Sequence, residues 1–488
     1  MKKIIDHVNE DVLEKAVKRA RERNIIIPTF KQQRNPELVP EKIKEKLKKV
    51  GLWDVNPLNL FRITWKNDIK TGLFGDVNYI EFPKKFTGVK NRIIGLVGKY
   101  FPTGAHKVGA AFGCLVPRLV SGEFDPTTQK AVWPSTGNYC RGGAFDCALL
   151  ACTAVAILPE EMSRERFDWL KSIGAEVIAT PGSESNVKEI YDKCWEIRNT
   201  KPDHVIFNQF DEFGNSIWHY YNTGSAVEEV YNKLKDSKSR MAAFVSATGS
   251  AGTIAAGDYL KKIKPAIKVV ASESLECPTI LLNGFGAHQI EGIGDKHIPW
   301  IHDARNTDMV VDIHDQQCMN LLRLFNEDKG KFYLVNQKFN KDFVDSLELL
   351  GISSIANLLA AIKVSKYFEY DENDVVFTVL TDSADLYRSR IVEQREMQGD
   401  YTEQEADVHY RRDFLDVKTD YMKELNYYDR KSIHNFKYFT WIEQQGKTIE
   451  ELNELWKPEF WDETFSQVSE WDEYIEEFNR RTGLLEKL

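Results

Sequence analysis

The spacing of hydrophobic residues changes twice along the chain, which divides the sequence into three stretches. Between positions 5 and 20, isoleucine, valine and alanine recur every three or four residues, a spacing that predicts an amphipathic helix. A second helix is predicted from Pro40 to a stop at Gly51. We therefore expect residues 1–90 to form a helical N-terminal extension, which packs against the core or against a partner subunit.

The second stretch, residues 91–390, alternates short apolar runs with segments of helical periodicity. The apolar runs are 93–97, 153–158, 176–179, 204–207, 242–245, 269–271 and 375–380. This alternation predicts an α/β fold whose mostly parallel sheet is covered by helices on both faces. Ligands bind to such folds at the carboxyl ends of the strands, so the loops that follow the apolar runs are the candidate site.

The third stretch, residues 391–488, is rich in acidic and aromatic residues and poor in glycine and in β-branched runs. Its four tryptophans, Trp441, Trp456, Trp461 and Trp471, make it too aromatic for a disordered tail. It is predicted to be a helical, aromatic-rich C-terminal extension.

Composition narrows the class of protein. The formal net charge of −9 argues against nucleic acid or an anionic membrane as the main partner. No run approaches the ~20 apolar residues that cross a bilayer, and the first residues lack the apolar region of a signal peptide. Seven cysteines without a Cys-x-x-Cys pair indicate reduced thiols and no metal cluster. We therefore expect a cytoplasmic protein that binds neither nucleic acid nor a membrane.

A lysine on a turn of small residues is the first candidate for chemistry. Lys107 ends the sequence Thr103-Gly104-Ala105-His106-Lys107, which follows the apolar run 93–97. Glycine and alanine leave room for a flat ring to approach the backbone. A lysine that apolar neighbours partly desolvate can form a Schiff base and move a proton. His106 is interpreted with equal weight as a donor to a phosphate or as a structural histidine.

A second candidate is the loop Gly249-Ser250-Ala251-Gly252-Thr253, which follows the run 242–245 and precedes a predicted helix near Ile254. Backbone N–H groups of small residues can converge on an anion at the positive end of a helix. A nucleotide P-loop would need a lysine before the final hydroxyl residue, but the next lysine is Lys261. A simple tight turn is the alternative for the loop taken alone.

The loop Ser135-Thr136-Gly137-Asn138-Tyr139 offers hydroxyls, an amide and a helix N-terminus, which suit a carboxylate. Simple helix capping is the alternative. Ser383 closes the run 375–380 and can hydrogen-bond a pyridine nitrogen without forcing its protonation. Such a ring is a weaker electron sink, which favours α-proton loss and departure of a β-substituent over transamination. Asp382 is interpreted as a cap or ion-pair partner.

Taken in order, these loops resemble those of the fold-type II pyridoxal-phosphate enzymes, which include cysteine synthase, cystathionine β-synthase and the tryptophan synthase β chain. The resemblance covers roughly residues 90–390. The lysine motif resembles that of the tryptophan synthase β chain. The segments that resemble cysteine synthase are 159–166, 208–211, the pair 223–224 after His219, 292–294 and 351–354.

The resemblance implies that Lys107 forms a Schiff base with pyridoxal 5′-phosphate. The residues implied to bind the cofactor are Lys107, His106, Asn138, Gly249, Ser250, Ala251, Gly252, Thr253 and Ser383. The residues implied to bind the substrate are Ser135, Thr136, Asn138, Tyr139, Gly292 and Gly294. The family also implies a mobile small subdomain at about 110–212 and usually a homodimer.

Departures from the cysteine synthase pattern leave the substrate open. Val108-Gly109 follows the lysine where cysteine synthases have Asp-Arg, and Glu291 stands where they tend to carry glutamine. The stretch 139–143 is somewhat similar to diaminopropionate ammonia-lyase.

The sequence therefore predicts a pyridoxal-phosphate lyase or β-replacement enzyme that acts on a small L-amino acid through an aminoacrylate. One alternative is the catalytic β subunit of a heteromeric enzyme, which the lysine motif favours. Another is a non-catalytic scaffold of the same fold, which the intact lysine, phosphate loop and serine disfavour.

Overall fold

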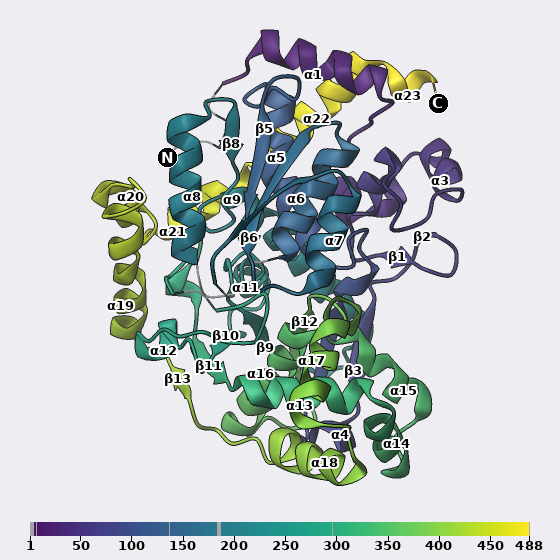
Figure 1. Ribbon diagram of the computed structural model, residues 1–488, viewed down its shortest axis with the longest axis vertical. Coiled ribbons are helices and arrows are strands. Elements are labelled where there is room, and N and C mark those ends of the chain that lie inside the picture. The colour runs from purple at the N-terminus through teal and green to yellow at the C-terminus, as the bar shows by residue number, and fades with distance from the viewer. Residues whose placement is uncertain (1–3, 6, 136, 183–186, 295, 488) are drawn as a thin grey trace.

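The computed structural model describes residues 4–5, 7–135, 137–182, 187–294 and 296–487 (Figure 1). A seven-stranded sheet has the order β13-β11-β10-β9-β12-β4-β3. Its strands are β3 (Tyr79–Phe82), β4 (Arg92–Val97), β9 (Arg240–Ala247), β10 (Lys268–Ser274), β11 (Met309–Ile313), β12 (Asp374–Leu380) and β13 (Met422–Glu424). The five inner strands are parallel, and the two edge strands are antiparallel to their neighbours.

A second sheet of four parallel strands has the order β7-β6-β5-β8. These strands are β5 (Lys130–Pro134), β6 (Thr153–Pro159), β7 (Glu176–Thr180) and β8 (His204–Ile206), and a short hairpin joins β1 (Asn67–Asp68) to β2 (Leu73–Phe74). The predicted α/β class with mostly parallel sheets is confirmed. The four-stranded sheet lies inside the range 110–212 of the predicted subdomain, whose mobility stays a prediction.

Helices cover both sheets. The helices of the central part are α4 (Lys84–Thr87), α5 (Lys107–Ser121), α6 (Asn138–Leu149), α7 (Arg164–Ser172), α8 (Val187–Thr200), α9 (Phe213–Trp218), α10 (Gly224–Leu234), α11 (Ala255–Ile263), α12 (Thr279–Leu282), α13 (Asp315–Asn326), α14 (Asp328–Asn336), α15 (Lys341–Ser346), α16 (Ile352–Tyr367) and α17 (Arg388–Gln398). The continuous apolar character of α5 and α16 fits their burial on nearly all sides.

Both ends of the chain are helical, as the sequence predicts. They contain α1 (Glu10–Glu22), α2 (Phe30–Arg34), α3 (Glu41–Leu47), α18 (Glu403–Val408), α19 (Tyr427–Lys437), α20 (Ile449–Glu454), α21 (Pro458–Ser466), α22 (Val468–Thr482) and α23 (Leu484–Lys487). The two extensions also supply β3 and β13, the antiparallel edges of the large sheet. The sequence did not reveal these strands, because three or four residues at a sheet edge carry too short a pattern.

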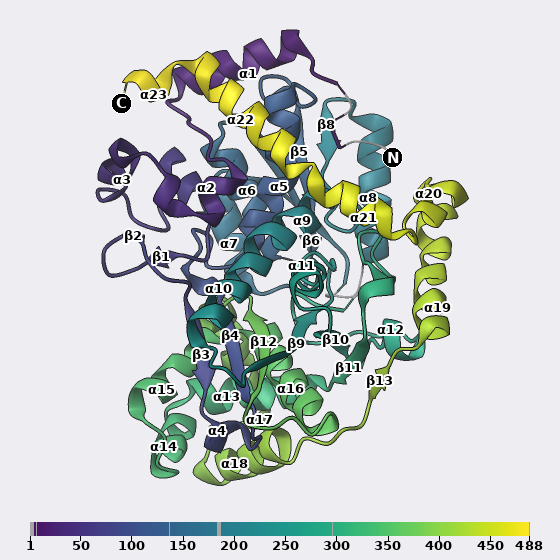
Figure 2. The same ribbon diagram turned by 180° about the vertical axis from the view of Figure 1, so that it is seen from behind.

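The two extensions pack on each other and on α5. Figure 2 shows α22 beside α1 at the back of the molecule. Asn479 on α22 exchanges two hydrogen bonds with the backbone of Ile27, at 3.0 and 2.7 Å. The Phe30 ring lies 5.6 Å from that of Trp471 and 5.5 Å from that of Phe112 on α5. The extensions therefore support the helix that begins at Lys107.

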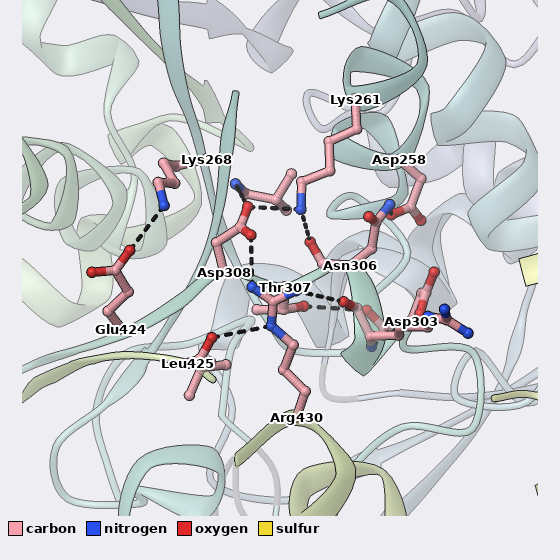
Figure 3. Close-up of polar contacts among 12 residues, drawn as sticks. Asp258, Lys261, Lys268, Asp303, Asn306, Thr307, Asp308, Glu424, Leu425 and Arg430 are labelled. Carbon is pink, nitrogen blue, oxygen red and sulfur yellow. Dashed lines mark hydrogen bonds and ion pairs between the residues drawn. The ribbon is translucent and has the colours of Figure 1, made fainter. Parts of the chain in front are cut away.

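A buried carboxylate fastens the C-terminal extension to the large sheet (Figure 3). Asp308, just before β11, accepts a hydrogen bond from Arg430 of α19 at 2.8 Å and forms an ion pair with Lys261 of α11 at 2.8 Å. Arg430 also donates to the backbone oxygens of Arg305 and Leu425. An exposed ion pair, Lys268–Glu424 at 2.8 Å, joins β10 to β13, the two strands that flank β11.

None of the described helices is by itself long and apolar enough to cross a membrane; one bent pair, 341–349 with 352–367, has the length and composition only when its two parts are joined.

Replacing Arg430 by methionine removes three hydrogen bonds at once. We expect the free energy of unfolding to fall by about 1–3 kcal/mol, because the partly buried Asp308 loses one of its two cationic partners. Urea denaturation followed by fluorescence measures this. In the control, Lys268→Met, the exposed pair with Glu424 is lost and the change should stay below about 0.5 kcal/mol. Equal losses in the two variants would contradict this role of Asp308.

Candidate active site

One narrow cavity brings together the lysine and the glycine-rich turn. It is lined by Lys107, Ser246, Ala247, Gly249, Ser250, Ala251, Gly252, Thr253, Gly292, Ile293, Asn357, Val379 and Thr381. Lys107 is the first residue of α5, and the turn 249–253 follows β9. The cavity therefore lies at the carboxyl ends of the parallel strands, where such folds bind their ligands.

The turn 249–253 has the form of an anion cradle. Ala251 has a left-handed φ of 61°, and α11 begins directly after the turn at Ala255. A β-carbon at Gly252 would collide with the side chain of Asn215, so only glycine fits there. Backbone N–H groups in such a turn, at the start of a helix, favour a bound anion.

Asn215, on α9, holds this turn in place. Its amide donates to the Ser250 hydroxyl and to the backbone oxygen of Gln209, both at 3.0 Å. Asn215 was not among the predicted site residues, because its one signal in the sequence is its position just after the segment 208–211.

A buried histidine lies behind the turn. His219 contacts the Thr253 hydroxyl through Nε2 at 3.5 Å and the Thr223 hydroxyl through Nδ1 at 2.8 Å. The Thr223 hydroxyl also accepts from the Trp65 indole at 3.0 Å. Burial, with the nearby His106 and Lys107, lowers the pKa of His219 well below its usual range, so a neutral imidazole faces Thr253.

His106 lies against His219 rather than on the cavity wall. The two rings are 4.9 Å apart and perpendicular, and both His106 ring nitrogens are buried without a hydrogen-bond partner among the described residues. Burial and the adjacent Lys107 lower the pKa of His106 to about 3. The backbone N–H of His106 donates to Thr381 at 3.3 Å, which ties the lysine loop to the end of β12.

Asn138 begins α6 and points to Asp382. Its amide donates to the Asp382 carboxylate at 2.6 Å, and the Tyr387 hydroxyl donates to the same oxygen at 2.8 Å. Burial raises the pKa of Asp382. Asn138 Oδ1 is buried without a partner among the described residues. Asp382 thus positions Asn138, a link that the sequence did not indicate.

Two predicted glycines and the predicted serine lie near the ends of the cavity's loops. Gly292 lines the cavity, and Gly294 follows it with its oxygen 2.8 Å from His288 Nε2. Ser383 is buried at the end of β12, with a long contact of 3.4 Å from its hydroxyl to Asp385.

The predicted carboxylate seat is only partly described. The Ser135 hydroxyl accepts from the N–H of Gly137 at 3.1 Å, and Thr136 lies outside the described residues. Tyr139 points into the interior, where its ring contacts Trp133 at 5.4 Å. Tyr139 is not among the residues that line the cavity.

Comparisons with known proteins match the part of the chain that contains the cavity. A family model described as "Pyridoxal-phosphate dependent enzyme" matches residues 99–382. Cysteine synthase of Staphylococcus aureus is 32% identical over 292 residues, which cover 59% of this chain and 84% of that protein. Cysteine synthase B of Campylobacter jejuni is 29% identical over 289 residues, covering 59% and 87%. The crystal structure of cysteine synthase from Entamoeba histolytica shares the fold, with a TM-score of 0.56, 22% identity and coverage of 68% and 92%.

Two opposite changes on one turn test the cradle. Gly252→Ala should weaken the affinity for pyridoxal phosphate at least about tenfold, because its methyl group displaces Asn215 and distorts the turn. Ala251→Gly, the control, relieves a left-handed φ and should leave the affinity within about threefold. Spectroscopic titration with the cofactor measures both. Equal affinity in the two variants would count against the cradle.

The neutral state of His106 makes stability depend on pH. In the unfolded chain, His106 binds a proton below its usual pKa of about 6.5. In the folded protein, the buried ring stays neutral down to about pH 3, because its pKa is lowered to about 3. Stability is therefore lost as the pH falls through that window. His106→Gln should reduce this loss by about 1.4 kcal/mol per pH unit, as measured by urea denaturation between pH 6.5 and 4. An unchanged slope would show that the ring titrates freely in the folded protein.

Proposed function

The chain belongs to the family of pyridoxal-phosphate-dependent enzymes, and we propose that it catalyses β-elimination or β-replacement on a small L-amino acid. One observation carries the proposal: Lys107 and the turn 249–253 line the same cavity. The similarity to cysteine synthases favours this chemistry over that of a heteromeric β subunit or a scaffold.

The residues around the cavity fit pyridoxal phosphate. The cradle that Gly252 keeps open and the hydroxyls of Ser250 and Thr253 suit its phosphate. Lys107 would bind its aldehyde carbon. The buried amide oxygen of Asn138, which accepts no hydrogen bond from the described residues, would contact the ring hydroxyl. Ser383, buried beyond β12, would face the ring nitrogen.

The cofactor, when bound, supplies an electron-withdrawing ring that weakens the Cα–H bond of an attached amino acid. Lys107 would take the α-proton, because its place at the start of α5 puts it on the wall of the cavity. Ser383, as a neutral donor, would not force protonation of the ring nitrogen, which would favour loss of a β-substituent over transamination. The neutral His219 contacts the Thr253 hydroxyl, which would orient this hydroxyl for a phosphate without adding charge.

The substrate side of the proposal concerns the loop 135–139. Ser135, Thr136, the N-terminus of α6 and the backbone at Tyr139 would receive the α-carboxylate. Gly292 and Gly294 would leave room for the substrate beside the turn. We further propose a homodimer in the cytoplasm, with the small sheet closing over the substrate.

Turnover tests decide the substrate within this class. The purified holoenzyme is incubated with serine, O-acetylserine, O-phospho-L-serine, cysteine, threonine and diaminopropionate, and release of ammonia, acetate, phosphate or sulfide is measured. Product from at least one of them is expected. Failure with all six, in the presence and absence of sulfide, would contradict the proposal.

Lys107→Ala should abolish turnover and the visible absorption of lysine-bound cofactor. No other group is proposed to bind the cofactor covalently or to take the α-proton of the substrate. Lys130→Ala, which removes an exposed pair with Glu176, is the control and should retain both. If Lys107→Ala kept turnover or the visible absorption, Lys107 would not be the residue that binds the cofactor and takes the α-proton.

A further inference from the structure

A buried arginine beside the candidate site has unused hydrogen-bond donors. Arg141 lies on the first turn of α6, three residues after Asn138, and is 4% exposed. One of its nitrogens donates to the backbone oxygen of Thr103 at 3.1 Å. The other two, Nε and Nη1, are buried without a hydrogen-bond partner among the described residues. The guanidinium stacks on the Trp169 ring at 4.5 Å, which fixes its plane.

Arg141 connects the two loops of the site. Thr103 belongs to the turn that leads to Lys107, and the next residue, Gly104, faces open space, since a β-carbon there would meet nothing within 4 Å. Gly142, next to Arg141, abuts the backbone of Lys107. Arg141 therefore lies where the start of α6 meets the lysine loop, next to the residues that line the narrow cavity but not among them.

A second guanidinium lies at that seat. Arg166 of α7 occupies the space that a side chain at Gly137 would need. Arg166 pairs with Glu291 at 3.2 Å and donates to the Tyr387 hydroxyl at 3.0 Å. Arg390 pairs with the same carboxylate and with Glu393, both at 2.7 Å, so two carboxylates match these two cations.

Arg141 differs from Arg166 because no carboxylate pairs with it directly. Within the described parts of the chain, Arg141 forms no ion pair, and two of its nitrogens have no hydrogen-bond acceptor. Burying a guanidinium without a full set of acceptors is costly, so a ligand anion would offset that cost. The proposed seat for the α-carboxylate already uses hydroxyls and helix N–H groups. The open donors of Arg141 are thus available to a second anionic group.

We propose that Arg141 determines specificity by binding an anionic group on the substrate's side chain. The substrate class is then an L-amino acid whose side chain carries a phosphate or a carboxylate, both of which suit a guanidinium. Arg141 lies on the first turn of α6, the helix whose N-terminus forms part of the proposed carboxylate seat, so one helix would present both binding groups. The inference rests on the proposed function and deepens it.

Pairs of amino acids that differ in side-chain charge test this on the holoenzyme. L-Aspartate and L-asparagine have nearly the same shape, and their affinities are compared by calorimetry. O-Phospho-L-serine and O-acetyl-L-serine are compared by kcat/KM. The wild-type enzyme should favour the anionic member of at least one pair by about 10- to 100-fold, as expected for a charge-assisted hydrogen bond. A preference confined to one pair would identify phosphate or carboxylate as the group.

Arg141→Gln should remove the preference while leaving the neutral member within about threefold, because glutamine can still donate to Thr103. Arg198→Gln is the matched control: its guanidinium also stacks on a tryptophan at 4.5 Å, but on the exposed face of α8. This control should keep the preference.

Equal affinity of the wild-type enzyme within both pairs would overturn the inference. The inference would also be overturned if Arg141→Gln lowered the affinity or kcat/KM equally for the charged and the neutral member of each pair. Arg141 would then only hold two loops together. If the enzyme turns over neutral substrates without any charge preference, this inference is wrong but the proposed function holds. If the enzyme neither binds nor turns over any amino acid, both are wrong.

Discussion

The close approach of α6 to the first turn of α5 is the constraint on which the site depends. A β-carbon at Gly142 would lie 2.8 Å from Val108 Cα and 2.9 Å from the oxygen of Lys107, so only glycine allows these helices to meet there. Each helix begins with a residue proposed to contact the cofactor, Lys107 or Asn138. Because the two helices meet so closely, Lys107 and Asn138 keep a fixed relation to each other.

The extensions at the two ends of the chain stabilise this arrangement from behind. Phe30 and Trp471 form an aromatic cluster with Phe112, one and a half turns into α5. The indole of Trp218 donates to Gln33 at 2.8 Å, which adds a buried polar tie between the first extension and α9. A role in bracing α5 therefore accounts for their position without requiring them to touch the substrate.

Electrostatics divides the site into a neutral half and a positive half. Around the turn 249–253, burial keeps His106 and His219 uncharged, and the donors are N–H groups and hydroxyls. Around α6, the buried guanidinium of Arg166 pairs with Glu291, and that of Arg141 keeps two nitrogens without a partner among the described residues. A doubly charged phosphate can be held by neutral dipoles at a helix end, whereas the open donors of Arg141 distinguish one substrate from another.

The fold class, the cofactor and the order of the loops could be predicted from local patterns in the sequence. Runs of β-branched residues and the small residues around Lys107 and 249–253 are such patterns, because backbone sterics and periodicity fix each of them. The distant groups that support these loops became visible in the folded chain. Asn215 under the turn, Asp382 on Asn138 and the open donors of Arg141 arise from contacts between segments far apart in the chain. Burial and hydrogen bonding between such segments depend on packing, so no local spacing could have predicted them.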